Sequence, residues 1–161
     1  MSEPERPAVG APAPDFTLRD QFGRDTSPSS FVGDKAVLLV FYPFAFSGVC
    51  TGELTAIRED LGRFSSEDVT TLTISCDPMF SLRAWADREG FFFPLLSDFW
   101  PHGEVSRRYG VFDEGMGAAL RGTFLIDRSG RIAWSLVGET GSPRDLSGYD
   151  EALRRLVATP S

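Results

Sequence analysis

The sequence has very few of the residues that bind metals or form disulfides. It contains two cysteines, Cys50 and Cys76, and one histidine, His102. Two cysteines are too few for the disulfide framework of a small secreted protein, and a structural zinc site usually takes about four Cys or His ligands. We therefore expect no metal site and no disulfide scaffold, so the cysteines must matter through packing or through reactivity.

Positive charge and long apolar runs are also scarce. Lys and Arg total 16 against 23 Asp and Glu, which gives a net charge of −7. Binding to nucleic acid or to an anionic membrane needs clustered positive charge. No stretch approaches the roughly 18 apolar residues of a membrane span, and the polar, proline-rich residues 1–14 lack the blocks of a signal peptide. The composition predicts a cytoplasmic protein with no nucleic-acid or membrane partner.

The chain does have enough apolar material for one hydrophobic core. It has 161 residues, of which 42% are hydrophobic and 14 are phenylalanine. That length suits one domain of ordinary size. Because no internal repeat or low-complexity linker interrupts it, we expect a single domain over residues 1–161, with residues 1–8 as a loose N-terminal arm.

Hydrophobic periodicity predicts strands that alternate with helices. The predicted strands cover residues 16–18 (an edge strand), 36–42, 69–75, 91–96, 122–126 and 132–137, and the predicted helices cover residues 48–64, 81–89, 104–109 and 148–157. Leu61 and Val157 are among the apolar residues expected to face the core. This order predicts an α/β domain with a mixed central sheet flanked by helices. In such open sheets the reactive site lies beyond the carboxyl ends of the parallel strands.

The segment after the first buried strand, YPFAFSGVC (42–50), carries the strongest chemical signal. Cys50 appears where a helix begins, and the free N–H groups and dipole of a helix N-terminus stabilise a thiolate, the nucleophilic form of cysteine. Ser47 lies about one helical turn earlier, so its hydroxyl can reach the sulfur or a bound oxygen. Pro43 has a fixed φ and no N–H, which suits a rigid shield over a small pocket.

Each of these residues also has a purely structural interpretation. Free cysteines are often buried and inert, Ser47 could serve only as a helix N-cap, and Pro43 could only end a strand. All three would have to coincide at one strand-to-helix junction. We therefore favour a reactive Cys50.

The spacing Pro43-x-x-x-Ser47-x-x-Cys50 resembles the active-site motif of the peroxiredoxins, Pro-x-x-x-Thr/Ser-x-x-Cys. Its surroundings are similar to those of the AhpE-type one-cysteine peroxiredoxins in particular. The similar segments are VLLVFYPFAFSGVCTGEL (37–54), FPLLSDFWPHG (93–103), YGVF (109–112) and RGTFLID (121–127). Together they cover nearly the whole domain, and the resemblance implies a thioredoxin-like fold.

Carried over by position, the resemblance makes Cys50 the peroxidatic cysteine, Ser47 the hydroxyl that binds peroxide, and Pro43 the shield. It places the family's arginine at Arg121, for which a surface ion pair is the structural alternative. Glu53 matches a carboxylate that often orients this arginine. The family more commonly has Thr at position 47, and Ser lacks the methyl that restricts χ1, so we expect a less rigid pocket.

The implied reaction is the reduction of hydrogen peroxide or an organic hydroperoxide by the Cys50 thiolate, which becomes a sulfenic acid. A permanent cation at Arg121 would stabilise the charge on the leaving oxygen, so no metal or organic cofactor is needed. The resemblance also implies a homodimer. It implies recycling by an external thiol or redoxin, such as mycothiol with mycoredoxin or a thioredoxin-like protein.

Two other functions use a reactive cysteine in a similar setting. A thioredoxin-like disulfide oxidoreductase needs a Cys-x-x-Cys pair, whereas Cys50 is followed by Thr51, Gly52 and Glu53. A peroxide-responsive sensor or interaction module, in which oxidation of Cys50 alters a binding surface, would share the reactive thiol and stays open. Repeated turnover with a supplied reductant distinguishes a peroxidase from such a sensor.

The remaining residues of interest carry weaker signals. Cys76 follows a buried strand directly, so joining it to Cys50 would demand unfolding of a helix turn, and we expect an inert thiol rather than a resolving cysteine. His102 is expected to be solvated or to cap a helix. Four aromatic residues are expected to line the pocket mouth or a dimer contact, with core packing for at least one: Phe44, Phe46, Phe99 and Trp100.

Overall fold

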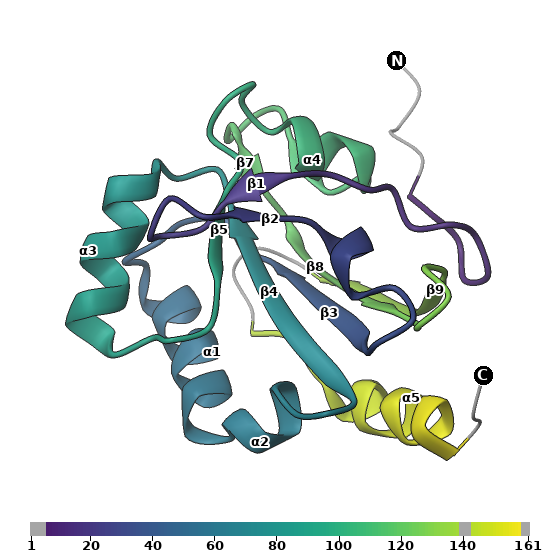
Figure 1. Ribbon diagram of the computed structural model, residues 1–161. Coiled ribbons are helices and arrows are strands. Elements are labelled where there is room, and N and C mark those ends of the chain that lie inside the picture. Colours follow the sequence, from purple (N-terminus) through teal and green to yellow (C-terminus); the bar gives the residue numbers. More distant parts are fainter. Residues whose placement is uncertain (1–5, 139–142, 159–161) are drawn as a thin grey trace.

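A seven-stranded mixed sheet forms the centre of the protein in the computed structural model, which describes residues 6–138 and 143–158 (Figure 1). Its strands are β1 (Leu18–Arg19), β2 (Asp25–Thr26), β3 (Ala36–Phe41), β4 (Val69–Ser75), β5 (Leu95–Ser97), β8 (Arg121–Ile126) and β9 (Ile132–Gly138), and β6 (Phe112–Asp113) and β7 (Ala118–Ala119) form a separate antiparallel pair. The helices are η1 (Pro28–Phe31), α1 (Gly48–Glu59), α2 (Leu61–Phe64), α3 (Met79–Glu89), α4 (Glu104–Arg108) and α5 (Ser147–Ala158).

The order of the strands in the sheet is β2-β1-β5-β4-β3-β8-β9. The pairs β3–β4 and β4–β5 are parallel, whereas β3–β8 and β8–β9 are antiparallel. Every residue of β3 is buried, because the strand lies inside the sheet and both of its faces are covered. The predicted mixed sheet flanked by helices is confirmed.

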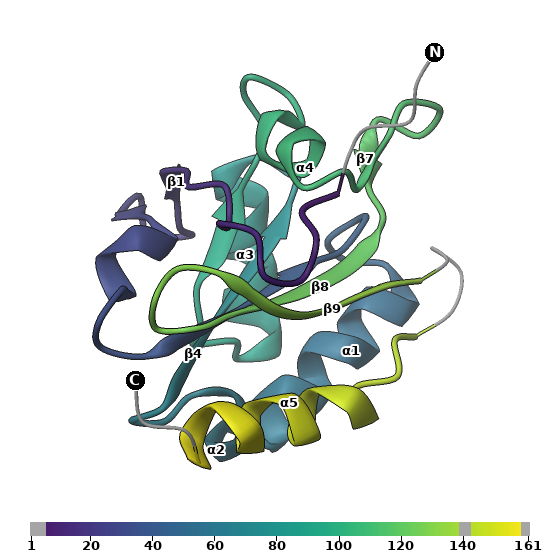
Figure 2. The ribbon, with the colours of Figure 1, turned by 90° about the vertical axis from the view of Figure 1, so that its right-hand side faces the viewer.

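Two apolar layers cover the two faces of the sheet (Figure 2). On one face, buried side chains of α1, α2, α3 and α5 pack with the even-numbered residues of β3, and Cys50 belongs to this layer. On the other face, α4 and the N-terminal segment around Phe16 pack on the odd-numbered residues of β3. We call these the α1 face and the α4 face.

Local corrections to the sequence-based expectations concern the ends of elements. The helix expected over residues 48–64 is interrupted at Asp60, and Leu61 is exposed because α2 starts in a new direction there. Val157 is also exposed, although its neighbours on α5 face the sheet. The strand expected at residues 16–18 is β1, and β1 is interior because β2 pairs on its outer side.

The start of the described chain lies along the domain. The Arg6 side chain donates a hydrogen bond to the carbonyl of Gly110 at 2.9 Å, and the Gly10 N–H donates to Ile132 at 2.8 Å. The first five residues of the expected N-terminal arm lie outside the described residues. In the described ranges, no helix is long and apolar enough to cross a membrane, and no cluster of His, Cys, Asp and Glu could hold a metal ion.

Candidate active site

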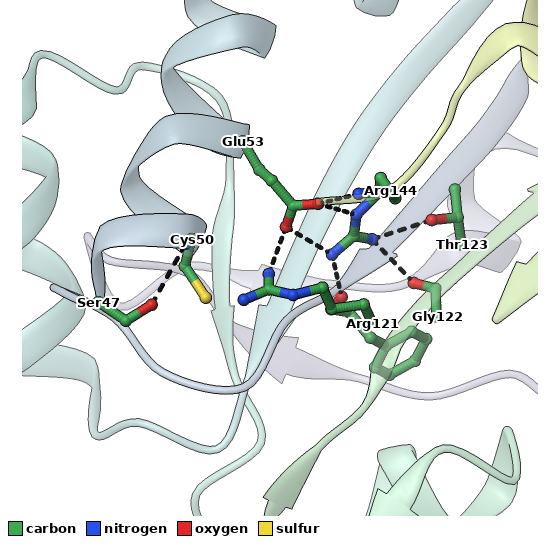
Figure 3. A network of polar contacts seen from close by, with 8 residues as sticks. Ser47, Cys50, Glu53, Arg121, Gly122, Thr123 and Arg144 are labelled. Atoms are coloured by element: carbon green, nitrogen blue, oxygen red, sulfur yellow. Dashed lines mark hydrogen bonds and ion pairs between the residues drawn. The ribbon is translucent and has the colours of Figure 1, made fainter. Parts of the chain in front are cut away.

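Cys50 lies in the first turn of α1, directly after the loop that follows β3 (Figure 3). Ser47 is the N-cap of this helix, and its Oγ accepts a hydrogen bond from the Cys50 N–H at 3.2 Å. Helix capping by Ser47 is therefore real, but it uses the oxygen as an acceptor and leaves the hydroxyl proton available to donate. The Cys50 residue is completely buried.

The loop between β3 and α1 is held in a restrained conformation. Pro43 at its start is buried, and Phe46 has a φ of +70°, which non-glycine residues adopt only at a cost in backbone energy. The Ala45 N–H donates a hydrogen bond to Asp77 at 2.8 Å, and the Ser75 hydroxyl donates to the same oxygen at 2.7 Å. Asp77, beyond the end of β4, therefore fixes this loop to the neighbouring strand.

Arg121 is the first residue of β8 and is brought to Cys50 by the direction of that strand. β8 runs antiparallel to β3, with Val40 opposite Thr123, so β8 begins where β3 ends. In Figure 3 the sulfur of Cys50 points into the space between the Ser47 hydroxyl and the Arg121 guanidinium. Arg121 is only 2% exposed, so the surface ion pair considered as its alternative is excluded.

The Glu53 carboxylate lies one turn along α1 from Cys50 and binds two arginines. Arg121 donates to Oε1 of Glu53. Arg144 donates to Oε2 from its backbone N–H at 2.7 Å and from Nε at 2.9 Å. The exposed fractions of the Glu53 and Arg144 side chains are 7% and 3%, so these ion pairs are buried.

Arg144 was missed by the sequence reasoning. It also donates to the carbonyls of Phe41 at 2.7 Å and Gly122 at 3.2 Å and to the Thr123 hydroxyl at 2.9 Å. It thereby connects the end of β3, the start of β8 and the first turns of α1. Its position before α5 follows no periodic pattern, so the sequence contained no local signal for this role.

The two arginines keep Glu53 ionised. Burial alone would raise the pKa of Glu53, but the hydrogen bonds and charge of Arg144, together with the charge of Arg121, hold that pKa below its ordinary value. The carboxylate is therefore negative at neutral pH. Its negative charge offsets part of the cost of burying the two arginine cations.

Cys76 occupies a different environment from Cys50. Its thiol interacts with Ser106 of α4 and the backbone of Ala119, on the α4 face, whereas Cys50 lies on the α1 face. Burial raises the pKa of the Cys76 thiol to about 12, and the nearby charge of Asp98 adds to this effect. Both cysteines are free thiols, and Cys76 is a neutral thiol at physiological pH.

His102 and the four aromatic residues singled out in the sequence lie at the surface. His102 is exposed, and its ring nitrogens contact the carbonyls of Gly117 at 2.6 Å and Phe99 at 3.2 Å, in agreement with a solvated residue. We expected at least one of the four aromatic residues to pack in the core, and this prediction is wrong because all four are exposed. The exposed aromatic residues are Phe44, Phe46, Phe99 and Trp100.

A hollow of about 310 Å³ lies beside α1. Its lining includes Val49, Ala56, Pro143 and the Glu53–Arg144 pair, but not Cys50. Since the sulfur is not one of its lining groups, this hollow is not the space in which a peroxide would meet the thiol.

The sequence of this chain matches a known family through most of its length. The AhpC/TSA family matches residues 9–135. Alkyl hydroperoxide reductase E of Mycobacterium tuberculosis is 50% identical over 150 residues, which are 93% of this chain and 98% of that protein. The chain is a peroxiredoxin of the AhpC/TSA family. The predicted thiol-dependent peroxidase activity is thereby confirmed, and the sensor alternative is not favoured.

Other peroxiredoxins support the same assignment. The chloroplastic 2-Cys peroxiredoxin BAS1 of Hordeum vulgare is 35% identical over 98% of this chain and 77% of that protein. The crystal structure of the peroxidoxin BcpB of Mycobacterium tuberculosis superposes with a TM-score of 0.81, 30% identity, and coverage of 97% of this chain and all of that one. The reduced 2-Cys peroxiredoxin of Plasmodium vivax gives a TM-score of 0.79 at 30% identity, over 93% of this chain and 80% of that one. These structures confirm the expected thioredoxin-like fold.

Proposed function

We propose that Cys50 is the thiol that this peroxiredoxin uses to reduce peroxides. The observation that carries the proposal is the position of the Cys50 sulfur, at the first turn of α1 between the Ser47 hydroxyl and the Arg121 guanidinium (Figure 3). A buried site with fixed donors stabilises charge better than water does, because its dipoles need not reorganise during the reaction. Pro43 shields this site from the solvent side of the loop.

The proposed step is an in-line displacement at a peroxide oxygen. The Cys50 thiolate donates an electron pair to one oxygen, an S–O bond forms, and the O–O bond breaks. The departing oxygen carries the negative charge and takes up a proton, so the products are a sulfenic acid and water or an alcohol. Ser47 orients the peroxide through its hydroxyl, and Arg121 stabilises the departing oxygen.

Arg144 and Glu53 act as positioning residues in this proposal. Arg121 has a long side chain that would lose its fixed geometry without a partner. Glu53 holds one of its nitrogens, and Arg144 holds the second oxygen of Glu53 while it binds the ends of β3 and β8. The guanidinium is therefore oriented before peroxide arrives, which reduces the ordering needed in the transition state.

Replacement of Arg121 by alanine should slow the reaction with hydrogen peroxide by about 10²-fold, the scale of removing one donor to a developing charge. Stopped-flow measurement of the single-turnover rate tests this. Arg128→Ala is the matched control, because Arg128 forms a partly exposed ion pair with Asp68 at 3.2 Å, far from the proposed chemistry. An unchanged rate in folded Arg121→Ala would remove this arginine from the mechanism.

We further propose a one-cysteine cycle, in which the Cys50 sulfenic acid is reduced by a thiol from outside the chain. Cys50 and Cys76 contact opposite layers of the sheet, and a disulfide needs their Cα atoms within about 7 Å with suitable Cβ directions. The neutral thiol of Cys76 is also a poor nucleophile. An internal disulfide would therefore require both a structural rearrangement and deprotonation.

Intact-chain mass spectrometry tests the one-cysteine cycle. After treatment with one equivalent of peroxide, the chain should gain one oxygen, which dimedone traps, and Cys76→Ser should behave in the same way. Rapid loss of two hydrogens that Cys76→Ser abolishes would instead identify Cys76 as the resolving cysteine.

The reductant, the assembly and the compartment complete the proposal. An external thiol or redoxin, such as mycothiol with mycoredoxin or a thioredoxin-like protein, reduces the sulfenic acid, and the similarity to the mycobacterial reductase supports this choice. The exposed aromatic side chains around Phe44 and Trp100 suit a contact between two copies in a homodimer. The acidic composition supports a cytoplasmic protein.

A further inference from the structure

One buried hydroxyl on the Cys50 side of the sheet has no hydrogen-bond partner. The chain has three tyrosines. Tyr109 donates to the carbonyl of Pro14 at 2.5 Å, and Tyr149 donates to the carbonyl of Arg63 at 2.9 Å. The Tyr42 hydroxyl is completely buried and has no hydrogen-bond partner among the described residues.

This situation is energetically unfavourable in the reduced protein. A hydroxyl that leaves water without gaining a hydrogen bond loses solvation free energy that nothing restores. Buried polar groups in native proteins usually have hydrogen-bond partners, so a buried hydroxyl without one is unusual. A phenylalanine at position 42 would keep the ring packing against Trp85, whose ring centroid is 5.6 Å away, without this cost.

Tyr42 belongs to the same buried layer as the reactive sulfur, and the charge of an ionised Cys50 acts on its hydroxyl. Tyr42 is the residue directly before Pro43, and it packs in the same buried layer as Cys50 on the α1 face. Neighbouring hydroxyls of Ser75 and Thr73 are already donors, to Asp77 at 2.7 Å and to the carbonyl of Pro94 at 2.9 Å. The two hydroxyls are near enough to lower the pKa of Tyr42, but no group of the described residues meets hydrogen-bond geometry with the phenol oxygen.

The phenol keeps its proton under all physiological conditions. Burial raises the pKa of Tyr42 far above its ordinary range, and the negative charges of Asp77 and of an ionised Cys50 act in the same direction. Tyr42 is therefore a permanent donor without an acceptor as long as Cys50 is reduced.

We propose that the Tyr42 hydroxyl donates a hydrogen bond to the oxygen atom that Cys50 gains when it reacts with peroxide. This inference rests on the proposed role of Cys50. Sulfur in the reduced side chain is a weak acceptor, whereas the new S–O group carries an oxygen with accessible lone pairs and extends the side chain by one atom. The phenol proton stays on Tyr42, so atoms and electrons balance as in the displacement described above.

With such a contact, the Tyr42 hydroxyl has a hydrogen-bond partner in the oxidised protein that it lacks in the reduced protein. Tyr42 directly follows β3 and its ring packs against Trp85 of α3, whereas Arg121 is the first residue of β8. The sulfenic oxygen would thus be held from two sides while it waits for a reductant.

Tyr42→Phe tests the proposal, because it removes only the hydroxyl. Thermal unfolding midpoints are measured for the wild type and the variant, each reduced and after one equivalent of hydrogen peroxide, with intact mass confirming one added oxygen. The reduced variant should unfold no earlier than the reduced wild type. Oxidation should raise the midpoint of the wild type relative to the variant by about 3 °C, the scale of one hydrogen bond in a chain of this length.

Tyr149→Phe is the matched control, because it removes a buried phenol hydroxyl that is hydrogen-bonded away from Cys50. It should lower the midpoint equally in both redox states. In the wild type, the near-ultraviolet difference spectrum between oxidised and reduced protein should contain a tyrosine band shift, and Tyr149→Phe should keep this shift whereas Tyr42→Phe should lack it.

The outcomes separate this inference from the function on which it depends. If the wild type gains no oxygen on Cys50, the proposed role of Cys50 is wrong. If Cys50 gains oxygen but oxidation changes the midpoints of wild type and Tyr42→Phe equally, and no tyrosine band shifts, then Tyr42 does not contact the added oxygen.

Discussion

Replacement of Cys50 by serine should reduce peroxide consumption to the background rate, a loss of about 10³-fold or more. Serine is nearly isosteric and retains a group that can attack. However, its alkoxide is not accessible near neutral pH, whereas a thiolate, the nucleophilic form of cysteine, is what the proposed mechanism uses at the start of α1. Loss of hydrogen peroxide is followed with purified protein and excess dithiothreitol.

Cys76→Ser is the matched control for this experiment, since it removes the only other thiol of the chain. The Cys76 thiol of the wild type is buried and neutral on the α4 face, so Cys76→Ser should consume peroxide at the wild-type rate. If Cys50→Ser retained near-wild-type turnover while Cys76→Ser lost it, the assignment of the two cysteines would be reversed.

Glu53→Gln should destabilise the fold by about 3–5 kcal/mol, the cost of removing one partner from a buried ion pair. The amide keeps the shape of the side chain but carries no charge, so Arg121 and Arg144, with exposed fractions of 2% and 3%, would lose the negative charge of Glu53. Urea denaturation gives the change in unfolding free energy.

Asp68→Asn is the control for this loss of charge. Asp68 pairs with Arg128 at 3.2 Å, but both side chains are more than a third exposed, so its loss should cost about 1 kcal/mol or less. Equal effects of the two substitutions would mean that the buried charges near Cys50 do not stabilise one another.

The contribution of Glu53 should depend on pH. Burial opposes its ionisation, but Arg144 and Arg121 lower its folded-state pKa below the unfolded value of about 4.3. The stabilisation is therefore fully present above about pH 4.3 and is lost as the pH falls through the folded-state pKa. The difference in unfolding free energy between wild type and Glu53→Gln should shrink in that acidic window, and a constant difference would contradict the lowered pKa.

Features that depend on short stretches of chain were predictable from the sequence. The apolar run at residues 36–42 is typical of a strand buried on both faces, and the apolar spacing after Gly48 predicts a helix with one apolar face. These two neighbours place Cys50 at a helix N-terminus whatever the remainder of the chain does. The motif around Cys50, and the family that it indicates, can therefore be recognised from one short segment of the sequence.

Contacts between distant segments were decided only by the tertiary structure. Arg144 binds Glu53 from 91 positions away, and nothing in its neighbourhood indicates that partner. Asp77 holds the loop at Ala45 because β3 and β4 end at the same edge of the sheet. In each case the partner of the side chain depends on where the strands end in space, which the sequence near that side chain does not specify.

The positions of the two cysteines were likewise determined partly by the sequence and partly by the tertiary structure. The sequence determined that Cys50 and Cys76 both follow buried strands and reach one edge of the sheet. Only the tertiary structure decided that they contact opposite layers, because the face on which a side chain lies depends on how the chain leaves its strand and on which helix packs there. The unpartnered hydroxyl of Tyr42 likewise arises from packing, since a missing hydrogen bond is defined by every surrounding group and not by neighbours in the chain.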